Sequence, residues 1–344
     1  MSSSKTIEQR KKDHLKIALS PHAQTGNSGF DFFRFIHNAL PEINYDEIDT
    51  ASVFLKKEVS YPFFISCMTG GVKEGKRINR NLAKAAQKYK IPMGVGSQRA
   101  SIEHADLADL FMAREVAPDI CLMANIGLVQ LNYGFGLSEY QKCIDMIKAD
   151  ALVVHINPIQ EIIQPEGDRN WKGLLSKLSK IIDKLSVPVI AKEVGFGLSD
   201  TVIERLYSIG IRYVDVAGWG GTNWSYVEAM RGKADKELGL LFSDWGIPTT
   251  EAIRMAKEVK SKKRNALTIL GSGGVRDGID IAKALCLGSD LVGLATPFGK
   301  AAFNSAMAVE ELIERLAKEL KTTMFGVGVK NINELQKVTL PKVA

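Results

Sequence analysis

The chain has 344 residues, of which 45% are hydrophobic and 24% are charged, the composition of a soluble globular protein. Its formal net charge of +6 is too small and too dispersed to indicate nucleic-acid binding, but it suits a small phosphorylated substrate. No segment approaches the roughly 20 apolar residues of a membrane helix, and the polar N-terminal segment has no signal-peptide core. The four cysteines form no CxxC pair, which indicates reduced thiols and a cytoplasmic protein.

Residues 1–61 show no regular apolar pattern, and we expect them to form an N-terminal extension over the main domain. Within it, residues 10–14 (RKKDH) form a basic cluster, which is typical of an exposed helical turn. Residues 30–43 carry spaced aromatic side chains, as expected of an amphipathic cover.

From residue 62 onward, apolar strands alternate with helices, which predicts a parallel sheet covered by helices. Eight such units over residues 62–320 match an α/β fold of the (β/α)8 TIM-barrel type, with a C-terminal tail at residues 321–344. An open doubly wound sheet would place GxGxxG directly after the first strand, whereas this chain has CMTGG there. The expected strands are 62–66, 92–95, 120–125, 151–156, 187–193, 213–218, 266–272 and 291–295, and the expected helices lie near 73–89, 104–116, 138–149, 171–185, 199–210, 249–262, 277–287 and 298–320.

The fourth strand and the loop after it, LVVHINPIQE at residues 152–161, carry a cluster of polar side chains. His155 and Asn157 face the same way, because side chains alternate along a strand. Gln160 and Glu161 follow on the loop. Together these groups can bind an anion, order a substrate and hold a metal, although an ordinary polar loop explains the segment equally well when it is taken alone.

In barrels of this kind the reactive residues lie at the carboxyl ends of the strands. The strongest signal is GSGGVRDG at residues 271–278, because glycine amides and a helix N-terminus bind phosphate. Two successive strand ends contribute, which favours a phosphate site over a simple tight turn. The strand ends in order are Cys67-Met68-Thr69, Ser97-Gln98-Arg99, Asn125, the 155–161 cluster, Lys192-Glu193, residues 218–224, residues 271–278 and Ala295-Thr296.

Lys192 ends an apolar strand, where an unpaired ammonium group is costly. It could form a Schiff base, or it could compensate the charge of an anionic cofactor ring. The structural alternative is an ion pair with Asp215 or Glu193. A pair with Glu193 is disfavoured, because neighbouring side chains on a strand point in opposite directions.

All five histidines precede residue 156, so the later strand ends have no imidazole base. This weighs against flavin oxidases of 2-hydroxy acids, which use a histidine at a late strand. The late strand-end loops also lack a cysteine, which weighs against the thiol chemistry of nucleotide dehydrogenases. Trp219, Trp224 and Trp245 could form a covering cluster on the rim, or an aromatic wall around an apolar or carbocation-like centre.

Seven motifs in chain order, RKxxH, MTGG, GSQR, HxNxxQE, KEVGFG, AGxGGTxW and GSGGVRDG, resemble the type 2 isopentenyl-diphosphate Δ-isomerases. The resemblance spans nearly the whole chain, and HxNxxQE with AGxGGTxW is its most specific part. Trp219 departs from the family pattern, in which a smaller residue is expected between the glycines. The resemblance implies an FMN-dependent barrel that interconverts isopentenyl and dimethylallyl diphosphate in isoprenoid biosynthesis, with reduced FMN and Mg²⁺ but without net redox change.

The resemblance also implies roles for individual residues. Gln160, His155 and Lys192 would be catalytic, with Gln160 beside the alkene and Lys192 balancing the anionic reduced ring. Glu161 would hold Mg²⁺ against the diphosphate. The implied FMN contacts are Cys67, Met68, Thr69, Ser97, Asn125, Lys192, Thr222, Gly273, Gly274, Val275, Arg276, Ala295 and Thr296, and the implied substrate contacts are Arg10, Lys11, Ser97, Gln98, Arg99, His155, Asn157 and Gln160.

The implied chemistry is consistent with these residues. Moving a double bond by one carbon requires a proton delivered at one end and removed at the other. The sequence shows no evident Asp/Glu pair for both tasks, whereas a reduced flavin can carry a proton and stabilise positive charge. The resemblance further leads us to expect NADPH as reductant and a homo-oligomer, a tetramer or octamer, in the cytoplasm, with no nucleic-acid or membrane partner.

Two other functions stay open at this point. A flavin oxidoreductase could use the same barrel for hydride transfer, given the shared phosphate loop and Lys192. A non-catalytic phosphate- or flavin-binding protein is the third hypothesis, and it leaves the HxNxxQE cluster without a role.

Overall fold

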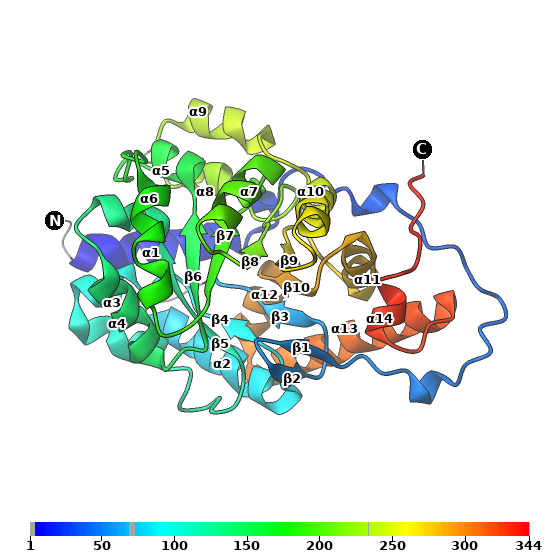
Figure 1. Cartoon of the computed structure of the whole chain (residues 1–344). Coiled ribbons are helices and arrows are strands. Elements are labelled where there is room, and N and C mark those ends of the chain that lie inside the picture. The colour runs from blue at the N-terminus through cyan, green and yellow to red at the C-terminus, as the bar shows by residue number, and fades with distance from the viewer. Residues whose placement is uncertain (1–3, 69–72, 233, 344) are drawn as a thin grey trace.

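Eight parallel strands form a closed ring, in which the last strand pairs with the first. The computed structural model describes residues 4–68, 73–232 and 234–343, and Figure 1 shows the strands surrounded by helices. The order around the ring is β10-β3-β4-β5-β6-β7-β8-β9, which confirms the predicted (β/α)8 barrel. The strands are β3 (Phe63–Ile65), β4 (Met93–Gly94), β5 (Leu122–Gly127), β6 (Ala151–Ile156), β7 (Val189–Glu193), β8 (Tyr213–Asp215), β9 (Thr268–Ser272) and β10 (Leu291–Leu294).

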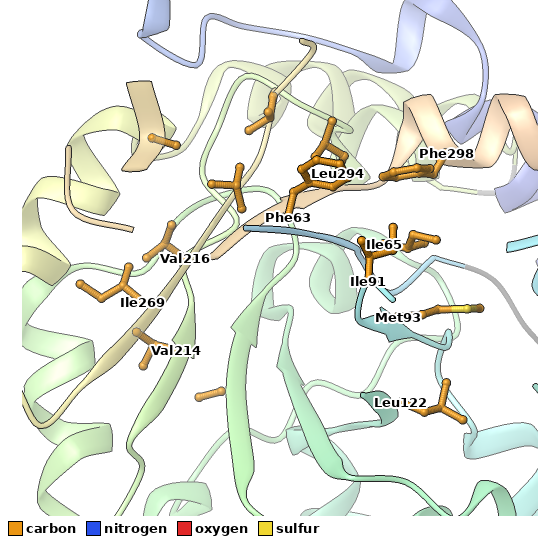
Figure 2. Packing of buried hydrophobic residues seen from close by; sticks show 14 of the residues in the cluster. Phe63, Ile65, Ile91, Met93, Leu122, Val214, Val216, Ile269, Leu294 and Phe298 are labelled. Atoms are coloured by element: carbon orange, nitrogen blue, oxygen red, sulfur yellow. The ribbon is translucent and has the colours of Figure 1, made fainter. Parts of the chain in front are cut away.

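Alternation along the strands separates two apolar layers. Residues such as Met123, Val153 and Ile190 belong to a cluster in the barrel interior. Their neighbours on the same strands join a larger cluster that includes residues of the helices, and Figure 2 shows Ile65, Leu294 and Phe298 in this outer layer. The sequence therefore determines, by parity alone, which side chains point into the barrel.

A small hairpin closes the amino-terminal end of the barrel. It consists of β1 (Ser52–Phe54) and β2 (Lys57–Val59), which pair antiparallel. Phe54 and Val59 belong to the interior cluster of the barrel. Apolar side chains thus fill this end, and the polar strand ends gather at the opposite, carboxyl end.

Most expected helices are present, with three differences. The helix expected near 104–116 is instead a short α3 (Arg99–Glu103) followed by a 3-10 segment (Ala105–Phe111). The one expected near 171–185 shrinks to α6 (Leu174–Ser179) and a 3-10 turn. The one expected at 298–320 is two helices, because Ser305 is extended and its hydroxyl accepts the Ala308 N–H at 3.0 Å. The outer helices are α2 (Lys73–Tyr89), α4 (Leu137–Ile147), α7 (Asp200–Ser208), α10 (Thr249–Lys262), α11 (Gly278–Leu287), α12 (Thr296–Asn304) and α13 (Ala306–Val327).

The extension has more regular structure than its sequence pattern suggested. Helix α1 (Ser4–Ala18) contains the basic cluster and lies against α8 (Trp224–Met230). The segment after it runs beside the C-terminal end of the chain (Figure 1), where the Val343 N–H bonds to the Phe32 carbonyl at 2.8 Å. The remaining helices are α5 (Pro158–Ile163), α9 (Lys236–Leu241) and α14 (Ile332–Leu335). Within the described residues, no helix has the length and apolar character needed to cross a membrane.

Candidate active site

The open end of the barrel contains one cavity, to which every barrel strand end in the described residues contributes. The side chains of Asn125, His155, Lys192 and Ser272 have the same parity as the interior cluster and therefore point inward. Helix α1 adds Arg10, Lys11 and His14 from the N-terminal extension. Further lining residues come from the loops after the strands and from the first turns of the helices that follow them, namely Cys67, Met68, Ser97, Arg99, Asn157, Gln160, Glu161, Gln164, Gly195, Gly221, Thr222, Trp224, Gly273, Gly274, Val275, Arg276, Ala295 and Thr296.

Lys192 lies at the floor of this cavity in an ion pair. Its Nζ atom lies 2.7 Å from Oδ2 of Asp215 and donates to the Ser272 hydroxyl at 3.4 Å. The ion pair with Asp215, which the sequence left open, is therefore present, and Lys192 also lines the cavity.

Glu193 points away from Lys192, as strand alternation predicted. Its Oε2 atom accepts hydrogen bonds from the backbone N–H groups of residues 194–197. Burial raises the pKa of Glu193 to about 7, against the opposing effect of these hydrogen bonds. Glu193 thus shapes the loop after β7.

His155 is held as a neutral ring. Its Nδ1 atom lies 2.7 Å from Oδ1 of Asn125, which can only accept, so Nδ1 carries the proton and Nε2 presents a lone pair. Burial, together with the charges of Lys192 and Arg99, lowers the pKa of His155 to about 4. Burial also raises the pKa of the neighbouring Cys67 thiol to about 11, so this thiol is uncharged.

The loop after β6 forms a network of amides and carboxylates. The Nδ2 atom of Asn157 donates to Oε1 of Gln160 at 3.1 Å and to Oε1 of Glu161 at 2.9 Å. The other oxygen of Glu161 accepts the Asp168 N–H at 2.7 Å. Nε2 of Gln160 donates to Oε1 of Glu228 at 3.0 Å. The orientation of Gln160 is thus fixed from both sides.

Glu228 connects this network to the N-terminal helix. His14 Nε2 lies 2.9 Å from Glu228 Oε1, and Arg231 Nη1 lies 2.5 Å from Oε2. Burial would raise the pKa of Glu228, but His14, Arg231 and Gln160 outweigh it and lower the pKa to about 2. Arg231 in turn pairs with Glu166 at 2.6 Å. Glu228 is therefore a fully buried but charged carboxylate.

The loops after β8 and β9 meet backbone to backbone. A Cβ atom on Gly273 would lie 2.2 Å from the Gly218 carbonyl, and one on Gly274 would lie 2.4 Å from the Gly220 carbonyl. Both glycines also have positive φ, 109° and 68°, so side chains are excluded there. Arg276 closes the loop pair through its bond to the Gly220 carbonyl at 3.2 Å.

The amino-terminal end of α12 opens into the same corner of the cavity. Its cap residue, Ala295, makes no side-chain capping bond, so the first-turn N–H groups lack that partner. Thr296 shares hydroxyl contacts with Thr222 at 2.9 Å and with the Gln24 amide at 2.7 Å. A glycine cradle beside a helix N-terminus is a favourable place for a phosphate group.

Three cations face the opposite side of the cavity. Arg99 forms ion pairs with Asp168 and Glu103. Burial lowers the pKa of Arg10. Burial and the charge of Arg10 lower the pKa of Lys11 to about 7. This concentration of positive charge is unfavourable unless an anion joins it.

Most site residues named from the sequence line the cavity, although their contacts with ligands stay predictions. Gln98 is an exception, and its assignment as a substrate ligand needs correction. It is fully buried, donates to the Cys143 carbonyl at 3.0 Å and accepts the Asn125 N–H at 2.9 Å. Its hydrogen bonds hold β5 against α4, outside the cavity. Thr69 lies outside the described residues.

Four residues of the site were not predicted from the sequence. His14 and Gln164 line the cavity, whereas Glu228 and Gln24 bond to the cavity residues Gln160 and Thr296. Glu228 is a carboxylate within the apolar segment YVEAM, which was an available signal. The three tryptophans separate: Trp224 lines the cavity and lies edge-on to His14 at 5.4 Å, whereas Trp245 is 58% exposed. Trp219 packs over Gly26 of the extension.

Comparisons with known proteins identify the family to which this chain is similar. A family model described as FMN-dependent dehydrogenase matches residues 154–342. An isopentenyl-diphosphate delta-isomerase of Nostoc sp. is 46% identical over 339 residues, which is 97% of this chain and 96% of that relative. The chain belongs to the isopentenyl-diphosphate delta-isomerase family. The isomerase of Rickettsia bellii is 47% identical over 335 residues, 96% of this chain and 97% of its own.

The family assignment and the flavin-domain match together confirm the type 2 resemblance found in the sequence. Solved structures add the fold. A mutant of flavocytochrome b2 has a TM-score of 0.68 at 18% identity, covering 97% of this chain and 82% of its own. A lactate oxidase of Pediococcus acidilactici has a TM-score of 0.69 at 16% identity, covering 99% and 93%. This isomerase-family chain differs from the base pattern of 2-hydroxy-acid oxidases, because it has no histidine after His155.

Proposed function

We propose that this chain interconverts isopentenyl diphosphate and dimethylallyl diphosphate on reduced FMN with Mg²⁺, without net redox change. The identity of 46% and 47% to two named isomerases, over nearly the full length of the chain, carries the proposal. The cavity supports it, because the neutral His155, the fixed Gln160 amide and the carboxylate of Glu161 all line it. The reaction would provide both isomers for isoprenoid biosynthesis.

The cavity fits FMN at its glycine corner. Gly273, Gly274 and the N-terminus of α12 would hold the phosphate, with Arg276 beside them. When bound, reduced FMN supplies an electron-rich ring that can carry a proton and stabilise nearby positive charge. Lys192, whose Nζ atom lies 2.7 Å from Oδ2 of Asp215, would lie against the negative side of that ring. Met68, Ser97 and Asn125 would complete the ring contacts, with Cys67, Thr222, Val275, Ala295 and Thr296 as further FMN contacts.

The opposite side of the cavity suits a diphosphate. Arg10, Lys11 and Arg99 supply positive charge, and a diphosphate would relieve their mutual repulsion. Glu161 would hold Mg²⁺, a hard ion that often binds one or two carboxylates together with substrate phosphate oxygens. The described residues include no group of three His, Cys, Asp or Glu suited to a metal, and a shared diphosphate site needs none.

The residues around the alkene position the substrate and hold protons at defined atoms. Gln160 presents a neutral amide whose orientation Glu228 and Asn157 fix. His155 holds its proton on Nδ1, so Nε2 would need a second proton to donate to the diphosphate. Trp224 adds an aromatic face, which can stabilise a developing positive charge.

Three features of the cellular setting belong to the same proposal. We infer NADPH as the reductant, the cytoplasm as the compartment, and a tetramer or octamer as the assembly. Exposed apolar residues of the extension support the assembly, since Ile36 and Leu40 are each 73% exposed.

The direct test is an anaerobic assay with isopentenyl diphosphate, Mg²⁺ and protein whose FMN is reduced. Formation of dimethylallyl diphosphate until equilibrium is expected, and no product under these conditions would overturn the proposal. Omitting Mg²⁺ should abolish most of the activity. Oxidised protein should be inactive until a reductant is added.

A further inference from the structure

One buried oxygen atom in the cavity wall lacks a partner. Asn157 is 3% exposed, and its Oδ1 atom has no hydrogen-bond partner among the described residues. Buried amide oxygens are nearly always paired, because leaving one unpaired is unfavourable. Asn157 lines the cavity, so the missing donor should come from a ligand in it.

The charge on Glu228 determines which atom of Asn157 is left unpaired. Arg231 pairs with Glu228 at 2.5 Å, and the carboxylate then accepts from Nε2 of Gln160 at 3.0 Å. Oε1 of Gln160 consequently faces Asn157 and requires a donor. Only Nδ2 of Asn157 can donate there, so Oδ1 must point the other way.

Flipping the Asn157 amide does not remove the unpaired oxygen. Oδ1 would then face Oε1 of Gln160 and Oε1 of Glu161, the two acceptors that Nδ2 now reaches at 3.1 Å and 2.9 Å. Three acceptors would meet without a proton between them. The orientation with Oδ1 directed to a ligand is therefore the one that the network allows.

The chemistry of the cavity restricts that ligand. The phosphate groups of FMN and of a diphosphate substrate offer acceptors, and the hydrocarbon part of the substrate offers no donor. The hydroxyl and N–H donors of FMN would lie towards the glycine corner and Lys192, whereas Asn157 contacts Glu161, the proposed metal ligand. Mg²⁺ usually keeps several waters when it binds carboxylate and phosphate, and these waters are strong donors. Because Nδ2 is the atom that faces Glu161, Oδ1 lies on the far side of the amide, where a water of the ion fits better than the ion itself.

We propose that Oδ1 of Asn157 accepts a hydrogen bond from a water bound to the Mg²⁺ ion that Glu161 holds. Asn157 then contacts the metal site twice, as a donor to the Glu161 carboxylate and as an acceptor for the metal's hydration shell. Groups that orient metal ligands and metal-bound water typically change metal affinity about 10- to 100-fold when mutated. This inference rests on the proposed Mg²⁺–diphosphate function.

The test measures Mn²⁺ binding in place of Mg²⁺, by the electron paramagnetic resonance signal of free Mn²⁺. The FMN-loaded protein is titrated in the presence of inorganic pyrophosphate, so no turnover is involved. The variant Asn157→Leu removes donor and acceptor, and Asn157→Asp removes the donor but retains an acceptor. The control Gln164→Glu adds a carboxylate to the same cavity wall. If the leucine variant fails to fold, Asn157→Ala takes its place.

We expect Asn157→Leu to weaken Mn²⁺ binding at least 10-fold, with Asn157→Asp and Gln164→Glu each within about 3-fold of the unmodified protein. Equal weakening in both Asn157 variants would overturn the inference, because it would show that only the donor matters. An unchanged affinity in Asn157→Leu would also overturn it. Tightening by more than about 3-fold in both Gln164→Glu and Asn157→Asp would also overturn the inference, because added negative charge alone would then explain the affinity. An unmodified protein that binds no Mn²⁺ with pyrophosphate would refute the proposed metal site itself, together with this inference.

Discussion

Lys192 combines a structural and a functional task. Its ion pair with Asp215 is almost fully buried, with side chains 9% and 2% exposed. Removing one partner of such a pair leaves an uncompensated charge and costs about 3 to 5 kcal/mol. The same ammonium group would balance a negatively charged reduced flavin, so its loss has two separable consequences.

We predict that Lys192→Met lowers the free energy of unfolding by about 3 kcal/mol and makes the FMN reduction potential more negative. The potential falls because the reduced ring loses its counter-charge. Thermal unfolding and a potentiometric titration measure the two effects. Lys283→Met is the matched control, since this buried lysine donates to the Phe30 carbonyl at 3.0 Å outside the cavity. A potential that stays unchanged in Lys192→Met would contradict the role given to this residue.

A second prediction concerns Glu161. Glu161→Gln keeps the size of the side chain but removes the charge that would hold Mg²⁺, so the Mg²⁺ concentration for half-maximal activity should rise at least about 10-fold. The measurement is initial rate against Mg²⁺ concentration. Glu204→Gln, on the outer helix α7 with a 44% exposed side chain, serves as control. An unchanged Mg²⁺ dependence in Glu161→Gln would remove Glu161 from the metal site.

At the scale of elements, α1 supplies charges that the barrel does not balance. Burial lowers the pKa of Lys11 from 10.5 to about 7, so the folded protein binds a proton there less readily than the unfolded chain. Lys11 therefore destabilises the fold increasingly as pH falls from 10.5 towards 7, and by a constant amount below that. A bound diphosphate should raise the pKa of Lys11 back towards its usual value and remove this destabilisation of the folded protein.

We consequently predict that pyrophosphate binding near pH 8 takes up protons, because Lys11 becomes charged in the complex. Isothermal titration calorimetry in buffers of different ionisation enthalpy measures the uptake. Lys11→Met should abolish most of it, while the exposed Lys16→Met on the same helix should leave it unchanged. The uptake should also decline below pH 6, where Lys11 is already protonated. Equal proton uptake in both variants would show that Lys11 does not take up the proton when pyrophosphate binds.

The sequence predicted the strands better than the helices. Apolar strands such as β6 and β7 are buried throughout most of their length, and their composition marked them clearly. Helix α1 was missed because its hydrophilic sequence gains its place only through contacts with α8. The break between α12 and α13 depends on one extended residue, Ser305, within a segment that otherwise favours helix. Tertiary contacts, and not the local sequence alone, therefore determine where these helices form and end.

At the scale of the whole molecule, the site is assembled from the barrel and from segments outside it. The positions of Asn125, His155 and Lys192 at expected strand ends correctly placed them at one mouth of the barrel. Strand positions could not place His14 or Glu228, because His14 lies in helix α1 of the extension and Glu228 lies in helix α8. Their approach to 2.9 Å follows from the packing of α1 on α8, which no local pattern encodes.

We expect copies of the chain to associate through exposed apolar residues of the N-terminal extension. Ile36→Asp combined with Leu40→Asp should break the proposed tetramer or octamer into smaller species, because charges replace two apolar residues that are each 73% exposed. Sedimentation velocity measures the change. Val53→Asp, at a site that is 65% exposed on the basal hairpin, is the control. An assembly that survives the double variant would show that copies associate through another surface.

We expect the flavin to act in this barrel without being consumed. To measure this, the FMN is reduced once under anaerobic conditions, the excess reductant is removed, and the dimethylallyl diphosphate molecules formed per flavin are counted. We predict many turnovers per flavin, with the ring still reduced at the end. A yield of one product molecule or fewer per flavin, with matching reoxidation of the ring, would contradict it and indicate a hydride-transfer enzyme instead.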